Sequence, residues 1–137
     1  MKVFVDTGAF IALTDADDSN HKIARIFYET QRDKGARFVT TNFVVCETLN
    51  YLRSKVAHGV AVSFREGIRK SGLFEIVSVT SLLEDTAFSI FKEYGDKDFS
   101  FTDCTSFAAM KSLKIRKAFA FDKHFGQYGQ FERLPSL

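Results

Sequence analysis

The stretch Val3-Phe4-Val5-Asp6-Thr7, near the start of the chain, decides the fold. Three apolar, β-favouring residues follow one another, a pattern typical of a strand that is buried on both faces in a parallel sheet covered by helices. Asp6 comes directly after them, at the carboxyl end of this strand. Ligands bind at that edge of open α/β sheets, and a buried carboxylate is costly unless something pairs with it. Asp6 is therefore the first candidate site residue.

The rest of the chain alternates short apolar strands with helices. Further strands are predicted at residues 37–41, 74–78 and 118–121, with a weak fifth strand near 131–133. Helices are predicted at residues 9–13, from 18 or 19 to 34, from 41 or 42 to 57, and at 60–70, 81–95 and 103–113. This alternation predicts a three-layer α/β/α sandwich around a central, mainly parallel sheet.

Local signals set several of these boundaries. Ser81-Leu82-Leu83-Glu84 has the pattern of a capping box, which predicts a helix start at residue 81. Ser100 or Thr102 is expected to cap the helix that begins at residue 103. His58-Gly59 are expected to break the chain between the two middle helices.

Composition describes an ordinary globular protein. The 137 residues, of which 45% are hydrophobic and 26% are charged, fit one domain covering residues 1–137. Sixteen phenylalanines and no tryptophan predict a core filled largely by phenyl rings. The net charge of +2 is compatible with a polyanionic partner but is too small to require one.

The cysteines and the N-terminus bear on the cellular compartment. Cys46 and Cys104 each fall inside a predicted helix without a Cys-x-x-Cys pattern, which favours small buried hydrophobic residues over a disulfide. Asp6 interrupts the first apolar run, whereas a signal-peptide core needs about 7–15 apolar residues. No apolar run approaches the length of a membrane span. We therefore expect a cytoplasmic protein with no membrane partner.

Three aspartates are expected to converge. Taken singly, Asp6 could be a helix N-cap, Asp103 a first-turn carboxylate favoured by the helix dipole, and Asp122 a turn residue. However, Asp6 and Asp122 each follow an apolar strand, so they share an edge if the strands are parallel. Asp103 begins the helix that leads into the strand before Asp122. Their positions therefore favour a common site.

Glu47 lies in the middle of a predicted helix that is apolar on nearly every side. Together with Asn50 and Ser54 it forms a thin polar stripe along that helix. The stripe is either a narrow solvent-exposed face or one wall of a cleft. Helical periodicity alone leaves these two interpretations equally open.

Four segments resemble, in order and spacing, the acidic motifs of the PIN-domain ribonucleases. They are Val-Phe-Val-Asp6-Thr, Thr-Thr-Asn-Phe-Val-Val-Cys-Glu47-Thr-Leu, Asp-Phe-Ser-Phe-Thr-Asp103-Cys-Thr-Ser-Phe-Ala and Phe-Ala-Phe-Asp122-Lys-His-Phe. The similarity covers essentially the whole chain. It is strongest to small, single-domain prokaryotic members, which include the toxins of toxin-antitoxin pairs of the VapC kind.

The resemblance implies an α/β/α fold, an acidic site that holds Mg²⁺ or Mn²⁺, and hydrolysis of RNA. It transfers metal-binding and catalytic roles to Asp6, Glu47, Asp103 and Asp122, with Thr102 as a hydroxyl helper. It also implies a cognate antitoxin protein as a partner. One departure is Gly8, where members often carry a polar residue such as Asn.

Electrostatics explains why such a cluster needs metal. Four carboxylates about 5 Å apart, at an effective dielectric constant of about 20, would repel by about 3 kcal/mol per pair. Divalent ions turn this repulsion into a binding site, and all-oxygen ligands suit Mg²⁺ or Mn²⁺. The histidines show no ligand spacing and are expected to be surface or capping residues. His124, two residues after Asp122, is the only one that merits a test as a site residue.

Two rival functions and one assembly state were weighed. A phosphatase of the haloacid dehalogenase type would need a second aspartate at the position of Gly8, so it is set aside. A PIN-like module that binds RNA or protein without cleaving it remains the alternative. A homodimer is predicted because the middle helices carry an excess of apolar residues, namely Phe43, Tyr51, Leu52 and Phe64.

Overall fold

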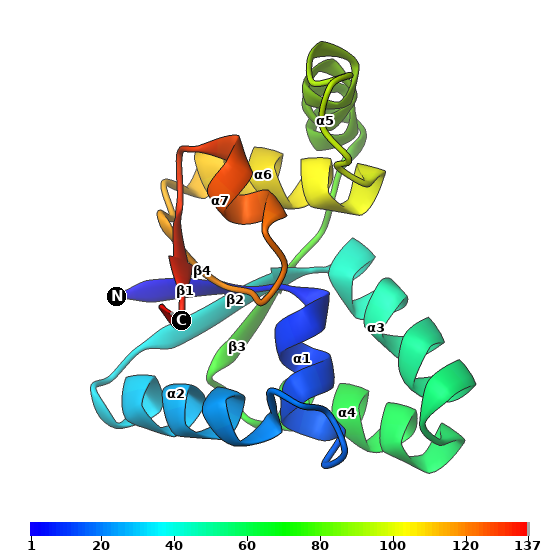
Figure 1. Ribbon diagram of the computed structural model, residues 1–137, viewed down its shortest axis with the longest axis vertical. Coiled ribbons are helices and arrows are strands. Elements are labelled where there is room, and N and C mark those ends of the chain that lie inside the picture. Colours follow the sequence, from blue (N-terminus) through cyan, green and yellow to red (C-terminus); the bar gives the residue numbers. More distant parts are fainter. Residues whose placement is uncertain (137) are drawn as a thin grey trace.

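The computed structural model describes residues 1–136 and contains a single five-stranded sheet (Figure 1). Its strands are β1 (Lys2–Val5), β2 (Arg37–Thr41), β3 (Phe74–Val77), β4 (Lys117–Phe119) and β5 (Glu132–Leu134). The strands lie in the order β3-β2-β1-β4-β5, and all four neighbouring pairs are parallel. The buried first strand is therefore the centre of the sheet, as predicted.

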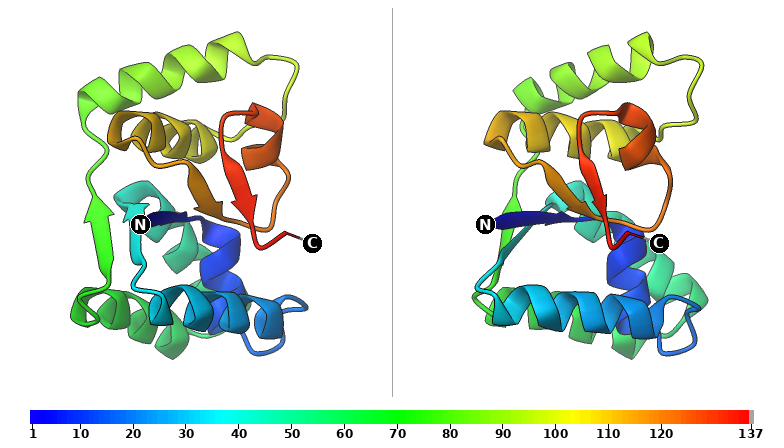
Figure 2. Two further views of the ribbon diagram at one scale, coloured as in Figure 1. Left: turned by 90° about the vertical axis from the view of Figure 1, so that its left-hand side faces the viewer. Right: turned by 60° about the vertical axis from the view of Figure 1, so that its left-hand side comes forward.

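Helices cover both faces of this sheet. They are α1 (Thr7–Thr14), α2 (His21–Asp33), α3 (Asn42–Lys55), α4 (His58–Lys70), α5 (Ser81–Glu93), α6 (Phe101–Leu113) and α7 (His124–Tyr128). Figures 1 and 2 show α1, α2 and α4 on one side with α3 beside them, and α6 and α7 on the other side. Helix α5 packs on the outer side of α6. The predicted three-layer α/β/α sandwich is confirmed.

Phenylalanine dominates the core. Val3, Phe4 and Val5 of β1 have no exposed surface, which explains the unbroken apolar run in the sequence. The largest fully buried side chains include Phe4, Phe10, Phe38, Phe107, Phe119 and Phe125. Each buried ring of this size contributes roughly 1.5–3 kcal/mol relative to an exposed one. This buried layer supports the strand ends that carry the acids.

One predicted capping box and one predicted helix break are wrong for local reasons, although α5 does begin at Ser81 as predicted. Helix α5 is capped by Thr80, whose side chain accepts a hydrogen bond from the Leu83 amide, so Ser81 is already helical and forms no capping box. The capping box lies instead at the start of α6, between Ser100 and Asp103. His58 and Gly59 begin α4 rather than separating it from α3.

The loop after β4 also differs from the prediction. The strand ends at Phe119 rather than at residue 121, and the short helix α7, which the sequence analysis missed, begins at His124. Five residues are too few to give a recognisable helical period. Asp122 therefore lies in the turn between β4 and α7 rather than directly at a strand end.

Burial corrects further expectations. Cys104 is buried as predicted, but Cys46 is exposed, because it lies on the outer side of α3; both are free thiols. Leu52 and Phe64 were expected at a dimer interface, but they are 0% and 6% exposed because they pack into the core. Within residues 1–136, none of the helices combines the length and hydrophobicity that crossing a bilayer would need.

Candidate metal centre

Three of the four predicted acids meet beyond the carboxyl ends of the central strands. Asp6 follows β1, Asp103 lies in the first turn of α6, and Asp122 lies in the turn before α7. Asp6 and Asp103 are only 3% and 6% exposed. Asp6 interacts electrostatically with both other carboxylates. The parallel sheet and the helix that feeds β4 bring these residues together, as the sequence predicted.

Asp6 occupies the N-cap position of α1, but its side chain does not cap the helix. The backbone is held in place by the Asp6 amide, which donates to the carbonyl oxygen of Phe119 at 3.1 Å. Among the described residues, Oδ1 of Asp6 is buried and has no hydrogen-bond partner. An unpaired, buried carboxylate oxygen is expensive, so capping does not account for this residue.

Asp103 has a structural role and a site role at once. Its Oδ2 accepts a hydrogen bond from the Ser100 amide, and its own amide donates to Oγ of Ser100, both at 3.0 Å. This capping box fixes the carboxylate at the start of α6. Oδ1 makes no hydrogen bond to any described residue, and Oδ2 keeps a second lone pair beside the one that accepts from Ser100, so both oxygens remain available to a ligand.

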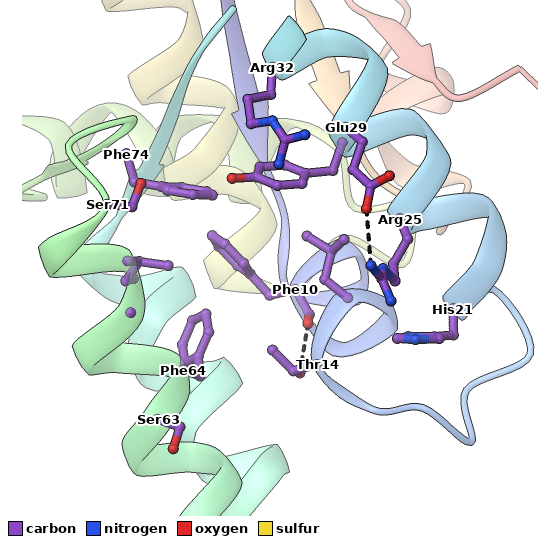
Figure 3. A pocket seen from close by; sticks show the side chains of 14 residues that line it. Phe10, Thr14, His21, Arg25, Glu29, Arg32, Ser63, Phe64, Ser71 and Phe74 are labelled. Atoms are coloured by element: carbon purple, nitrogen blue, oxygen red, sulfur yellow. Dashed lines mark hydrogen bonds and ion pairs between the residues drawn. The ribbon is translucent and has the colours of Figure 1, made fainter.

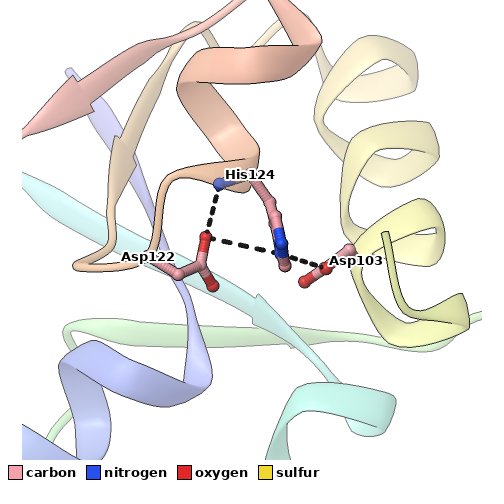
Figure 4. A group of neighbouring side chains, drawn as sticks. All are labelled: Asp103, Asp122 and His124. Carbon is pink, nitrogen blue, oxygen red and sulfur yellow. Dashed lines mark hydrogen bonds and ion pairs between the residues drawn. The ribbon is translucent and has the colours of Figure 1, made fainter. Parts of the chain in front are cut away.

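His124 joins Asp103 and Asp122 in one cluster (Figure 4). Its amide donates to Oδ1 of Asp122 at 2.9 Å, and its ring atom Nδ1 lies 2.8 Å from Oδ2 of Asp103. One potential ligand atom from each of the three residues lies within 4.8 Å of the others. His124 lies outside the acid site that the sequence predicts, although its position two residues after Asp122 was a signal that could have placed it there.

Burial raises the pKa of two of these acids. The pKa of Asp6 is raised well above its ordinary value, first by burial and then by the negative charges of Asp122 and Asp103. Burial likewise raises the pKa of Asp103, against the lowering effects of the Ser100 amide and of His124. Both carboxylates thus favour a proton, or another cation, more strongly than they would in water.

The residues present fit a divalent ion. Asp6 Oδ1, Thr7 Oγ1 and Ser106 Oγ are buried oxygens without hydrogen-bond partners among the described residues. The clustered carboxylates add hard oxygen ligands, which suit Mg²⁺ and Mn²⁺. A cation among the carboxylates would compensate the unpaired Oδ1 of Asp6 and the like charges.

Glu47 lies in a neighbouring pocket rather than in the tight cluster. It is exposed on α3 and, with Thr102, lines a cavity of about 520 Å³. The other lining residues are Asn42, Phe43, Cys46 and Asn50. Thr102 directly precedes Asp103, so this cavity adjoins the acids. Glu47 and Asn50 of the polar stripe on α3 therefore border this cavity, whereas Ser54 is not among its lining residues. None of the described ion pairs or hydrogen bonds joins Glu47 to the three aspartates.

A second cavity of about 470 Å³ lies between α1, α2 and α4 (Figure 3). Its only carboxylate among the described lining residues is Glu29, which is paired with Arg25 at 3.0 Å. His21, another lining residue, places Nδ1 2.7 Å from the carbonyl oxygen of Ala12. These contacts give the cavity no cluster of unpaired carboxylates, and it is not a candidate for the metal centre.

The chain is similar to known proteins along nearly its whole length. Residues 3–130 match the PIN domain. The chain is 34% identical over 133 residues to a protein named 23S rRNA-specific endonuclease VapC20 from Mycobacterium tuberculosis, covering 97% of this chain and 98% of that protein.

Solved structures agree as well. The crystal structure of M. tuberculosis VapC20, described as a sarcin-ricin loop cleaving toxin, superposes with a TM-score of 0.87 at 32% identity, covering 95% of this chain and 97% of that one. VapBC2 from Rickettsia felis, solved with a promoter DNA fragment, has a TM-score of 0.73 at 9% identity, covering 97% of each chain, and shows the shared fold only. The chain belongs to the PIN-domain family.

Proposed function

We propose that this protein is an endoribonuclease that hydrolyses phosphodiester bonds of RNA at the acidic centre. The observation that carries this proposal is the buried Asp6 carboxylate, whose Oδ1 has no hydrogen-bond partner among the described residues and which lies beside two further carboxylates. Such an arrangement is unfavourable in a purely structural role and suited to a divalent cation. The similarity to a named endonuclease along nearly the whole chain supports the same reading.

Asp6, Asp103 and Asp122 would hold Mg²⁺ or Mn²⁺, and Glu47 would complete the site from the adjoining pocket. A bound divalent ion supplies a water of lowered pKa and positive charge for the phosphate. The chain itself supplies fixed carboxylates, with Asp103 held by the Ser100 amide, and Thr102 offers a hydroxyl near the substrate. Burial raises the pKa of Cys104, which directly follows Asp103, to about 11, which favours the protonated thiol over a thiolate nucleophile near neutral pH.

The substrate we propose to test is a structured loop of 23S ribosomal RNA. The motivation is the name of the relative that is 34% identical along 97% of this chain. The net charge of +2 is mild, so long-range attraction alone would not select an RNA. Selection would then depend on contacts in the cleft beside the acids.

We further propose that the protein acts in the cytoplasm as the toxin of a toxin-antitoxin pair and forms a homodimer. The partner proposal is motivated by the VapBC2 assembly, whose fold this chain shares. The apolar residues available for a dimer are not the buried Leu52 and Phe64 but exposed residues such as Phe88 and Phe91 of α5.

The alternative is a PIN-like module that binds RNA or a protein without cleaving it. Incubating the protein with end-labelled 23S RNA fragments, in Mn²⁺ or in EDTA, separates the two functions. We expect discrete cleavage products in Mn²⁺ and none in EDTA. Retention of intact RNA at saturating Mn²⁺ would contradict the nuclease and favour the binding module.

A further inference from the structure

The contacts of the His124 ring are unusual for an ion pair. Nδ1 is buried and lies 2.8 Å from Oδ2 of Asp103 and 3.9 Å from Oδ1 of Asp122 (Figure 4). Despite the short distance, Nδ1 forms no aligned hydrogen bond with any described residue. The ring nitrogen is therefore not aimed straight at either carboxylate oxygen.

Neighbouring ligands of one metal ion have this relationship. With metal–ligand distances of about 2.1 Å in an octahedral site, adjacent ligand atoms lie about 3 Å apart and opposite ones about 4 Å apart. Each ligand atom aims at the ion and not at its neighbour. The separations of 2.8 and 3.9 Å around Nδ1 fall in this range.

We propose that Nδ1 of His124 is a ligand of the divalent ion, together with Asp103 and Asp122, so that the site is a mixed nitrogen–oxygen centre. This inference rests on the metal site of the proposed function. It goes further by adding a ligand of another chemical class to the four acids.

The surroundings of His124 hold its ring in place. Its amide is bound to Asp122 at 2.9 Å, so the turn before α7 ties the histidine to one carboxylate ligand. The ring of Phe99 meets the imidazole edge-on, with centroids 5.7 Å apart. The Ser100 amide anchors the other carboxylate, Asp103. Three separate contacts thus set the position of the donors before an ion arrives.

A nitrogen ligand changes which ion the site prefers. Mg²⁺ strongly favours oxygen ligands, whereas imidazole suits first-row transition ions. A site built from aspartates and His124 should therefore bind Mn²⁺ more tightly than Mg²⁺, and the preference should depend on the imidazole. If His124 only positions Asp103, its removal should weaken both ions alike.

The test is a calorimetric titration of the wild type and of His124→Ala with Mn²⁺ and, separately, with Mg²⁺. We expect His124→Ala to lose at least about tenfold in Mn²⁺ affinity and less than about threefold in Mg²⁺ affinity. The matched control is His58→Ala, because His58 is exposed at the start of α4, and it should change neither affinity. Pulsed EPR of bound Mn²⁺ should show nitrogen coupling in the wild type and none in His124→Ala.

The outcomes are distinct. Equal losses for both ions, or no loss for either, would overturn the histidine ligand. A wild type that binds neither ion would contradict the metal site and hence the proposed function as well. Melting of each variant without metal checks its fold, and His124→Asn replaces the alanine variant if that one is unfolded.

Discussion

Asp6 shows how a residue of the first strand gains a chemical role from its surroundings. Sequence alone allowed Asp6 to be a helix N-cap, and the residue does occupy that position. Its carboxylate, however, makes no capping hydrogen bond and is buried among like charges. That outcome could not be read from the chain, because it depends on which side chains lie across the sheet edge. The convergence of Asp6, Asp103 and Asp122 could be predicted, since parallel strands share their carboxyl edge.

The raised pKa values of Asp6 and Asp103 predict how the metal-free protein responds to pH. Acids with raised folded-state pKa values bind protons more tightly in the folded state, so their contribution to stability is fully present below the unfolded pKa of about 3.9. It is lost as pH rises through the raised pKa values. We expect Asp6→Asn to show a smaller decrease in unfolding free energy with rising pH. Near neutral pH this variant should be at least as stable as the wild type.

Urea unfolding in EDTA at a series of pH values measures this effect. Asp85→Asn, an exposed change on α5, is the control and should keep the wild-type pH dependence. A wild-type stability that rises between pH 4 and neutrality while Asp6→Asn shows the same slope would contradict the assigned charge repulsion.

Helical periodicity left two alternatives open for Glu47, and the family resemblance favoured the cleft. Glu47 lines the cavity beside Thr102, so we expect Glu47→Gln to reduce the rise in melting temperature produced by Mn²⁺. The metal-free protein should change by no more than about 0.5 kcal/mol, because Glu47 is exposed. Thermal melting across a Mn²⁺ titration measures both quantities, with Glu93→Gln as the exposed control. An unchanged Mn²⁺ response would leave a site without Glu47.

At the scale of elements, apolar runs predicted the strands well, while helix starts depended on single hydrogen bonds. β2 has the predicted bounds, because Arg37–Thr41 is flanked by clear breaks. The start of α4 was wrong by two residues, and the cap of α5 was assigned to Ser81 instead of Thr80, because which of two adjacent polar residues caps a helix depends on backbone angles that the sequence does not reveal. Helix α7 was missed for its length, and with it the loop that presents Asp122 and His124.

Capping chemistry gives a direct test at this scale. Ser100→Ala removes the acceptor for the Asp103 amide and should cost about 1 kcal/mol of unfolding free energy. Ser81→Ala is the matched control, because Ser81 is a first-turn residue and not the cap, so it should cost much less. Denaturant unfolding of both variants in EDTA measures the two losses of unfolding free energy. Equal costs for the two substitutions would contradict the observed capping pattern.

At the scale of the whole molecule, the exposed aromatic residues of α5 bear on assembly. Phe88 and Phe91 are 56% and 45% exposed, and their rings stack with centroids 6.5 Å apart. Large exposed apolar groups on one helix face often mark an interface. We expect light scattering to show a dimer at micromolar concentration and Phe88→Glu to shift it towards monomer. The control is Ile26→Glu on α2, which should not shift the dimer towards monomer. A monomeric wild type would contradict the homodimer.

The central claim is that buried carboxylates at the carboxyl edge of the sheet hold the ion that enables RNA cleavage. Its most direct test is the rate of cleavage of a labelled 23S RNA fragment in Mn²⁺ by wild type, Asp6→Asn and Asp103→Asn, each shown to be folded by its melting curve. We predict a loss of at least about 100-fold for both variants, while Asp85→Asn keeps the wild-type rate. Undiminished cleavage by both folded variants would contradict the claim.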